Sequence, residues 1–306
     1  MSKLHVAFAT LSVLAGCRPE PETIGALPQT TEAEPTSSSP SGTEDGDDED
    51  TAATTQTGES STGASGVTVT IRVRATADPF THDDPWSGQT ARDFFAGIRS
   101  LTLIDDSGRH DDLHVFDLSP DYVEAGWNDG DDTILAVVPA EALTYGTYSR
   151  ARVGVSHLRF TVDTTVHALG IVAAGEVVAA QVLSDGTTLD GQTRDRGWWR
   201  YVFHFAGMQF PLGGEDGAPV TQPPPGGAIE VVVEGNETAV YFPTSLLVDP
   251  TVQNDVNAVL EVNVHEAFRW QDLDEPDYTV GVFDASPPDF EPIRQLGVNH
   301  YGLGFE

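Results

Sequence analysis

The residues best suited to bind an ion form a short acidic run before an apolar segment. Asp129, Asp131 and Asp132 surround Gly130 in this run. Hard cations such as Ca²⁺ prefer several carboxylate and carbonyl oxygens in a flexible loop. The run lacks the full twelve-residue calcium loop with its final bidentate glutamate, so an acidic turn leading into a strand is the simpler interpretation. Calcium is the one cofactor that these residues suggest.

A second group of chemically useful side chains lies in the aromatic stretch 198–205. Successive residues of a strand point to opposite faces. One face should therefore fill the core with the rings of Trp199, Tyr201, Phe203 and Phe205. The other face carries Trp198, Arg200 and His204. An aromatic ring beside an arginine can stack on a sugar ring or a partner peptide, whereas a second covered face is the simpler alternative.

Motifs for catalysis do not occur in the sequence. It contains no Gly-x-Ser-x-Gly, no glycine-rich phosphate loop and no His-Glu-x-x-His. His110 and His114 lie in a region with a strand pattern, where residues four apart are about 13 Å apart and cannot share an ion without a third element. Ser156 and His157 are neighbours on an expected strand, so they should point to opposite faces. We therefore expect a protein that is not an enzyme.

Most of the remaining sequence has the pattern of β-strands. Residues 67–74 alternate apolar and polar side chains throughout, which indicates a strand with one buried face. Residues 101–104 and 113–118 flank a turn sequence and predict a hairpin. Further strands are expected at 133–138, 148–162, 199–205, 229–233, 259–264 and 278–282, and short helical turns at 89–98, 139–143 and 252–259. The predicted fold class is all-β, an antiparallel β-sandwich of the prealbumin or immunoglobulin kind.

Cys17 is the only cysteine, and it ends the sequence Leu14-Ala15-Gly16-Cys17. The apolar run before it is shorter than the roughly 20 residues that cross a bilayer, but it suffices for a signal-peptide core. This leader resembles the lipobox of bacterial lipoproteins, which implies that residues 1–16 are a signal peptide and that Cys17 carries lipid. Acyl chains, at about 0.8 kcal/mol per buried CH₂, would hold the chain in the bacterial cell envelope. We expect the outer membrane, on its periplasmic or surface face.

Residues 17–66 differ sharply in composition from the rest. Ser, Thr, Pro, Gly and acidic residues dominate, and no aromatic residue occurs. Such a segment cannot bury enough apolar surface to offset its chain entropy. We expect a disordered tether between the lipid and a folded domain at 67–306. Within that domain, residues 213–227 include three consecutive prolines and predict a loop or hinge.

The chain is strongly acidic, with 48 Asp and Glu against 15 Lys and Arg and a net charge of −33. Residues 18–66 hold eleven of the acids, which leaves 37 in residues 67–306 beside 13 arginines, a charge near −24. A surface of this sign repels nucleic acid and anionic lipid. Nucleic acid is therefore excluded as a partner.

Three segments carry a resemblance to a known family: Phe95–Asp105, Leu143–Val155 and Val262–Trp270. In the second, Gly-Thr-Tyr introduces a long expected strand. These segments resemble small exported β-sandwich proteins of the DUF4382-like group and, more distantly, the methanobactin-associated MbnP-like proteins. The resemblance implies an exported β-sandwich, and the MbnP-like proteins imply copper handling in the periplasm. The chain lacks the additional cysteines that this copper chemistry leads us to expect.

Together, these features predict a membrane-anchored envelope lipoprotein that presents a non-catalytic β-sandwich binding module. The expected partner is an envelope protein or a glycan. Two alternatives remain open. One is a periplasmic protein that binds copper or calcium, and the other is an exported hydrolase whose cleft the sequence does not reveal.

Overall fold

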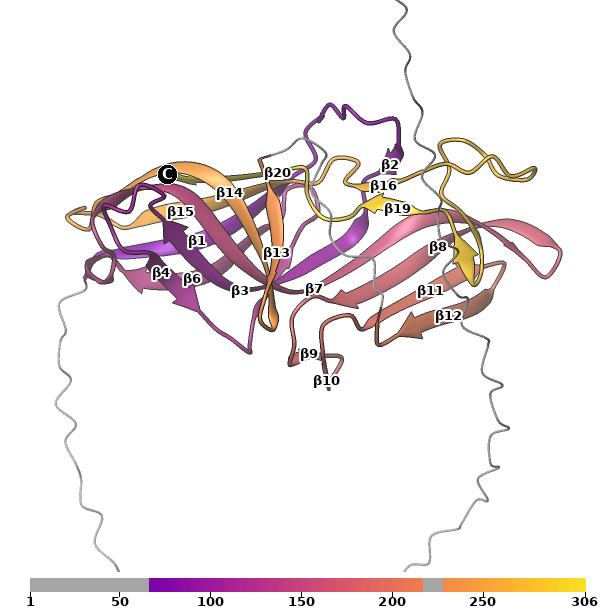
Figure 1. Ribbon diagram of the computed structural model, residues 1–306, viewed down its shortest axis with the longest axis horizontal. Helices are drawn as coiled ribbons and strands as arrows, with labels where there is room; N and C mark the ends of the chain where they lie inside the picture. Colours follow the sequence, from indigo (N-terminus) through magenta and orange to yellow (C-terminus); the bar gives the residue numbers. More distant parts are fainter. Residues whose placement is uncertain (1–65, 217–227) are drawn as a thin grey trace, which may run out of the picture. The chain divides into compact units, whose positions relative to one another are not determined.

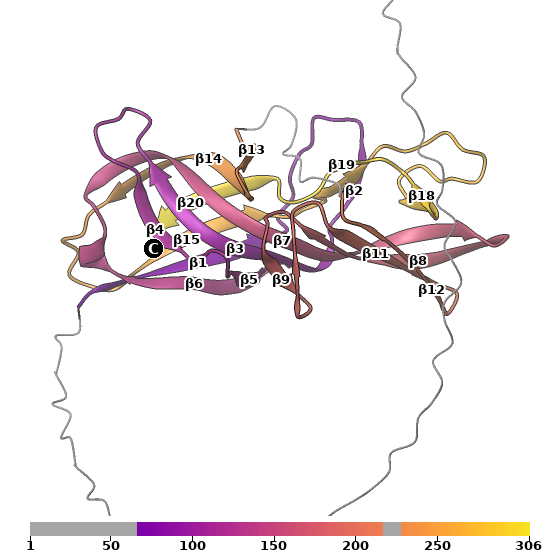
Figure 2. The same ribbon diagram turned by 60° about the horizontal axis from the view of Figure 1, so that its bottom comes forward.

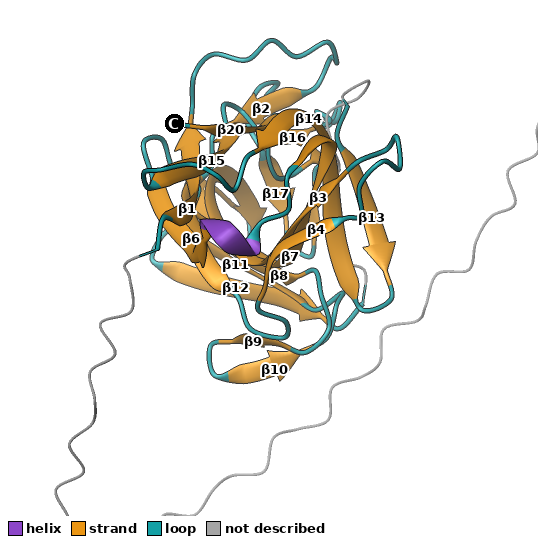
Figure 3. Ribbon diagram, turned by 90° about the vertical axis from the view of Figure 1, so that its left-hand side faces the viewer, coloured by secondary structure: helices purple, strands orange, loops and turns teal. Residues whose placement is uncertain are grey.

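The computed structural model describes residues 66–216 and 228–306, and nearly all of the regular secondary structure in these residues is β-strand (Figure 1, Figure 3). Within them the only helical element is one 3₁₀ turn, η1 (Ala140–Ala142), inside the expected turn at 139–143. The predicted signal peptide, Cys17 and nearly all of the predicted tether lie outside the described residues, as does most of the predicted loop at 213–227. No helix in the described part of the chain has the length and apolar character needed to cross a membrane.

The described residues contain twenty strands, which confirm the all-β sandwich. Their bounds are β1 (Thr68–Thr76), β2 (Ser87–Gln89), β3 (Arg92–Ile104), β4 (Leu113–Asp117), β5 (Val123–Gly126), β6 (Asp132–Pro139), β7 (Gly146–Ala168), β8 (Ile171–Val182), β9 (Thr187–Leu189), β10 (Gln192–Arg194), β11 (Trp199–Phe205), β12 (Met208–Gly214), β13 (Glu230–Glu234), β14 (Glu237–Val248), β15 (Val256–Asn263), β16 (Phe268–Trp270), β17 (Asp284–Ser286), β18 (Asp289–Phe290), β19 (Ile293–Gln295) and β20 (His300–Phe305).

The first sheet has the strand order β20-β15-β1-β6. Its β1–β15 pair is parallel and its other pairs are antiparallel. As the alternating sequence predicts, Val69, Ile71 and Val73 are buried on one face of β1. That face packs against Leu101 of β3 and Leu246 of β14. Figure 3 shows β1, β6 and β15 on one side of the core and β3, β4 and β14 on the other.

The long strand β7 organises the second sheet. On one edge it pairs first with β14 and then with β8, and on the other edge with β3 and then with β17. β11 and β12 extend the sheet beyond β8, so β7, β8, β11 and β12 lie side by side in Figures 1 and 2. A third sheet has three strands in the order β19-β16-β2.

A β-bulge interrupts β7 at Ser156 and His157. In the pairing with β3, Ile98 faces Val155 but Ala96 faces Leu158, so β7 carries an additional residue. The inward positions of β7 therefore change phase, from 151, 153 and 155 to 158, 160 and 162. The bulge allows each half of this long strand to bury its apolar side chains.

Aromatic side chains from the C-terminal segment cover the inner face of β8 and β11. Tyr201 and Phe203 are buried there, as the alternation of the stretch predicts. Both rings contact Phe290, at centroid distances of 5.9 and 6.4 Å. Phe160 contacts Phe268 at 5.8 Å. One face of β11 is thus committed to the core, and the other is left to solvent.

Three sequence-based expectations were wrong. Residues 89–98 form the last residue of β2 and the first half of β3 instead of a helical turn, because β3 is buried on both faces and shows no alternation of polar side chains. Residues 252–259 lead into β15, which pairs with β1 from Val256 onward. Residues 278–282 form turns rather than a strand, since Gly281 has φ +85° and the Asp284 carboxylate accepts the Thr279 N–H.

Candidate functional site

The outer face of the second sheet brings residues from β7, β8 and β11 into rows. The pairing of β8 with both neighbours fixes these rows. From one end to the other they are Arg159–Ala180–Arg200, Thr161–Val178–Val202 and Asp163–Glu176–His204. In the first two rows the middle residue is small or apolar, Ala180 and Val178, and in the third it is Glu176. The longer side chains of Arg159 and Arg200 stand on either side of Ala180.

This face is hollowed into a groove of about 530 Å³. The three residues that the sequence analysis placed on one face, Trp198, Arg200 and His204, all line it. An adjoining hollow of about 480 Å³ shares Glu176 and His204 with the groove. Small-molecule sites commonly have volumes of about 300–1,000 Å³, so the groove has the size of a ligand site.

Each wall of the groove carries an aromatic ring held by an arginine. The Arg194 guanidinium lies 4.7 Å from the centre of the Trp198 ring. The Arg159 guanidinium lies 5.3 Å from the centre of the Phe95 ring. A cation above a ring face is attracted by the ring's quadrupole and limits the ring's motion. Each contact therefore favours the ring orientation that the structure shows.

The charged groups along the groove carry both signs. The guanidinium of Arg92 contacts Asp163 at 2.5 Å and Glu176 at 3.4 Å. The hydrogen bond that Arg92 donates to the Asp163 carboxylate is the main cause of a raised pKa for Arg92. Among the described residues Arg200 forms no salt bridge, and it is exposed. The exposed ion pairs of Arg92 with Asp163 and Glu176 contribute little to stability. Their charged groups, like that of Arg200, are therefore available to a ligand.

The three carboxylates of the predicted calcium site have separate partners. Asp129 accepts the Ala77 N–H at 2.9 Å, and Asp132 pairs with Arg72 at 2.8 Å. Asp131 accepts the backbone and side-chain N–H groups of Asn128 at 2.8 and 2.7 Å. These contacts shape the turn before β6 and must compete with any ion. The calcium site stays a prediction.

Other histidines and acids give a different picture of possible metal binding. His114 lies with its Nδ1 atom 3.1 Å from Thr102 Oγ1, and it is exposed. Within residues 66–216 and 228–306, one group of three side chains is close enough to share an ion, and it consists of His82, His265 and Glu266. Sequence reasoning missed this group, because two loops 183 positions apart supply its histidines.

The expectation that Ser156 and His157 point to opposite faces was wrong. Ser156 Oγ lies 2.9 Å from His157 Nδ1, because the bulge breaks the alternation of β7 at these two residues. The hydroxyl also lies 3.2 Å from the carbonyl oxygen of Gly97. Glu124 lies 3.4 Å from His157 Nε2. Both Ser156 and His157 are fully buried, so a substrate has no access to this hydroxyl.

Burial lowers the pKa of His157 to about 4. Desolvation of the imidazolium is the largest cause, and Glu124 opposes it while Arg159 and Arg99 add to it. At neutral pH the ring is uncharged. This histidine is therefore a pH-sensitive element of the core.

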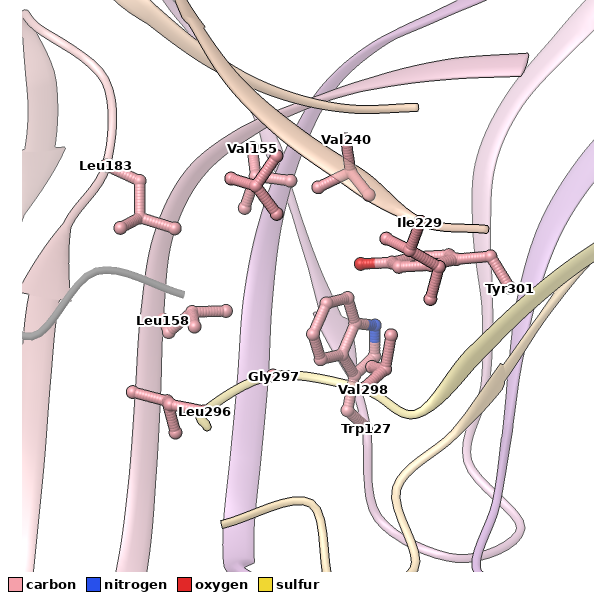
Figure 4. Close-up of a pocket in the computed structure, with 11 residues that line it drawn as sticks. Trp127, Val155, Leu158, Leu183, Ile229, Val240, Leu296, Gly297, Val298 and Tyr301 are labelled. Atoms are coloured by element: carbon pink, nitrogen blue, oxygen red, sulfur yellow. The ribbon is translucent and has the colours of Figure 1, made fainter. Parts of the chain in front are cut away.

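A small cavity lies in the core beside Trp127 and Tyr301 (Figure 4). Val155, Leu158 and Val240 also line it. Its volume is about 20 Å³, close to the roughly 10–15 Å³ that a single water needs. It is too small for an organic ligand and is a packing gap in the core.

Cys17, the predicted lipid attachment site, lies outside the described residues. No family model, curated protein or solved structure matches this chain. The resemblance to exported β-sandwich proteins therefore remains a prediction.

Proposed function

We propose that this chain is a lipid-anchored envelope protein whose all-β domain binds a neutral saccharide in the groove over β7, β8 and β11. One observation carries the proposal: Trp198, Arg200 and His204 line a single groove of about 530 Å³. The covered inner face of β11 explains why these side chains remain outside the core. The groove can hold a ligand without unfolding of the domain.

Saccharide chemistry fits the composition of the groove. A sugar ring has an apolar face of C–H groups and a rim of hydroxyls. The aromatic faces of Trp198 and Phe95 can stack on the apolar face of the sugar, and Val178 and Ala180 form the floor of the groove. The sugar hydroxyls can form hydrogen bonds with the donors and acceptors of Glu176, His204 and Gln209.

The charge of the groove favours a neutral ligand. Arg159 and Arg200 lie among three carboxylates, those of Asp93, Glu176 and Asp190. With both signs present, neither a polyanion nor a polycation gains a uniform electrostatic attraction. The adjoining hollow of about 480 Å³ continues past Glu176 and His204, which suits an oligosaccharide better than a single sugar.

A glycan array of neutral gluco-, manno- and chito-oligosaccharides tests this proposal, followed by calorimetry on the full chain. We expect Trp198→Ala to weaken binding at least about tenfold, which corresponds to about 1.4 kcal/mol. Ala180→Leu should also weaken binding, because it fills the floor between two arginines. Ile134→Ala removes an exposed aliphatic side chain from β6, in the other sheet, and serves as the control.

Two results would remove the saccharide proposal. The first is an array without bound sugars. The second is an affinity that Trp198→Ala and Ala180→Leu leave unchanged. New reducing ends released from a bound oligosaccharide would instead support the hydrolase alternative.

The lipid anchor is a separate part of the proposal, supported by the sequence Leu14-Ala15-Gly16-Cys17. In a bacterial host, the wild-type chain should fractionate with membranes, because two or more acyl chains give stable anchoring. Cys17→Ala should move the chain to the soluble fraction of the envelope. Retention of Cys17→Ala in the membrane fraction would argue against lipidation at this residue.

A further inference from the structure

Three side chains from distant parts of the chain converge next to the small sheet β19-β16-β2. His82 lies in the loop between β1 and β2, and His265 and Glu266 lie between β15 and β16. β2 pairs with β16, with Gln89 facing Phe268, and so the two segments are brought together. One nitrogen of each histidine and one carboxylate oxygen of Glu266 all lie within 4.8 Å of one another.

The imidazole of His82 has unused binding capacity. Both of its ring nitrogens are buried, and neither has a hydrogen-bond partner. Buried polar atoms in proteins are nearly always paired, and an exception calls for a specific reason. A ligand placed among His82, His265 and Glu266 would supply the missing partner.

The surroundings hold this loop in place on both sides of His82. Asp84 forms an ion pair with Arg269 at 2.5 Å, and both side chains are almost fully buried. The carbonyl oxygen of Asp78 accepts a hydrogen bond from Asn263 at 2.9 Å. A buried ion pair with one carboxylate and one guanidinium fixes position more than it adds stability. His82 is thus positioned by contacts that leave both of its ring nitrogens unused.

Glu266 is held in a conformation that a glutamate rarely adopts. Its φ is +47°, in the left-handed region. Its N–H donates to Thr90 Oγ1 at 2.8 Å, which anchors the turn to the segment after β2. Such strain is found where the side chain's direction matters. Here the turn sets the carboxylate beside the two imidazoles.

His265 can change its hydrogen bonding at small cost. Its Nδ1 accepts the Phe80 N–H at 3.3 Å, the longest of the hydrogen bonds that hold the 77–86 loop. A metal on Nδ1 would replace this contact directly. A metal on Nε2 would require the proton on Nδ1, which also ends the contact. Among the described residues this is the one hydrogen bond that the His265 ring would give up on coordination.

We propose that His82, His265 and Glu266 bind a zinc-like divalent transition-metal ion, with a water in the fourth position. Two imidazoles and one carboxylate suit Zn²⁺, which takes nitrogen ligands at about 2.0–2.1 Å and oxygen ligands at about 2.0–2.2 Å. In a tetrahedral site such ligands lie about 3.4 Å apart, so side-chain movements of about 1 Å complete the geometry. The ion would join the 77–86 loop to the segment after β15.

The test is metal binding by the full chain after removal of metal with a chelator. The chain is dialysed against Zn²⁺ in excess Mg²⁺, which occupies the many surface carboxylates, and bound zinc is measured by mass spectrometry. We expect one zinc per chain and a higher Tm with zinc. Co²⁺ in its place should give the visible absorption of a four-coordinate site.

Three variants separate the site from the rest of the surface. His82→Ala and Glu266→Gly should each weaken zinc binding by at least about 100-fold, since loss of even an outer partner costs about 10–100-fold. Glu266→Gly also relieves the left-handed backbone, so it should fold at least as well as the wild type without zinc. His114→Ala removes an exposed histidine and should bind zinc normally.

Two results would overturn the proposal. One is a wild-type chain that retains no zinc in the presence of Mg²⁺. The other is an equal zinc content and an equal zinc-dependent rise in Tm for the wild type, His82→Ala and Glu266→Gly. Loss of saccharide binding by Trp198→Ala has no bearing on either result, so the two proposals can fail separately.

Discussion

His157 should make the stability of this domain depend on pH. The ring is fully buried in the bulge of β7, and burial lowers its pKa from an ordinary value of 6.5 to about 4. In the unfolded chain the same imidazole takes up a proton near pH 6.5. The perturbation that isolates this effect is His157→Gln, which keeps polar atoms at the site but cannot titrate.

The size of the effect follows from the two pKa values. Between about pH 6.5 and 4 the unfolded state binds more protons than the folded state, so stability falls as the pH falls. A difference from 6.5 to about 4 corresponds to about 3 kcal/mol, which is fully lost below pH 4. Between pH 7.5 and 5 the expected loss from His157 alone is about 2 kcal/mol.

The assay is urea unfolding of the full chain, followed by tryptophan fluorescence at several pH values from 7.5 to 5. His82, whose pKa burial also lowers, adds a loss of the same sign, and Glu291, whose pKa burial raises, adds an opposite one. Both groups are present in the wild type and in His157→Gln. The difference between the two proteins therefore reports His157.

The matched control is His114→Gln, which removes an exposed histidine of β4. It should keep the pH dependence of the wild type. If the wild type and His157→Gln lose stability in parallel, to within about 0.5 kcal/mol between pH 7.5 and 5, then His157 is not held neutral by burial and the reasoning fails.

The bulge and the acidic turn give two further predictions. A Cβ atom on Gly97 would lie 2.0 Å from Ser156 Oγ, so Gly97→Ala should cost about 3 kcal/mol or more in urea unfolding, whereas Gly304→Ala, which meets open space, should change little. A Gly97→Ala chain as stable as the wild type would contradict the close packing of Gly97 against Ser156 in the bulge. Millimolar calcium is expected to raise the Tm if the turn before β6 binds it, and the Asp131→Asn variant should lose that response. An unchanged wild-type Tm would remove Asp129, Asp131 and Asp132 as calcium ligands.

Part of the fold could be predicted from the sequence because the alternation of apolar and polar side chains is a local property of a strand. Residues 67–74 and 199–205 showed which side chains share a face, and burial of Val69, Ile71 and Tyr201 confirms it. Residues 171–182, which form β8, were missed. Their outward side chains include Val178 and Ala180 on the groove floor, so the strand has no clear polar alternation.

Local sequence patterns predicted that the described part of this chain is all-β, and that Trp198, Arg200 and His204 share one face. Packing between distant segments leaves this face open, because aromatic rings from the C-terminal segment cover the other one. It also placed Arg159 opposite Arg200 and brought His82 to His265. The physical reason is that a period of two fixes only which side of its own strand a residue occupies. Strand register, the bulge in β7 and contacts between distant loops depend on pairings that no local pattern specifies.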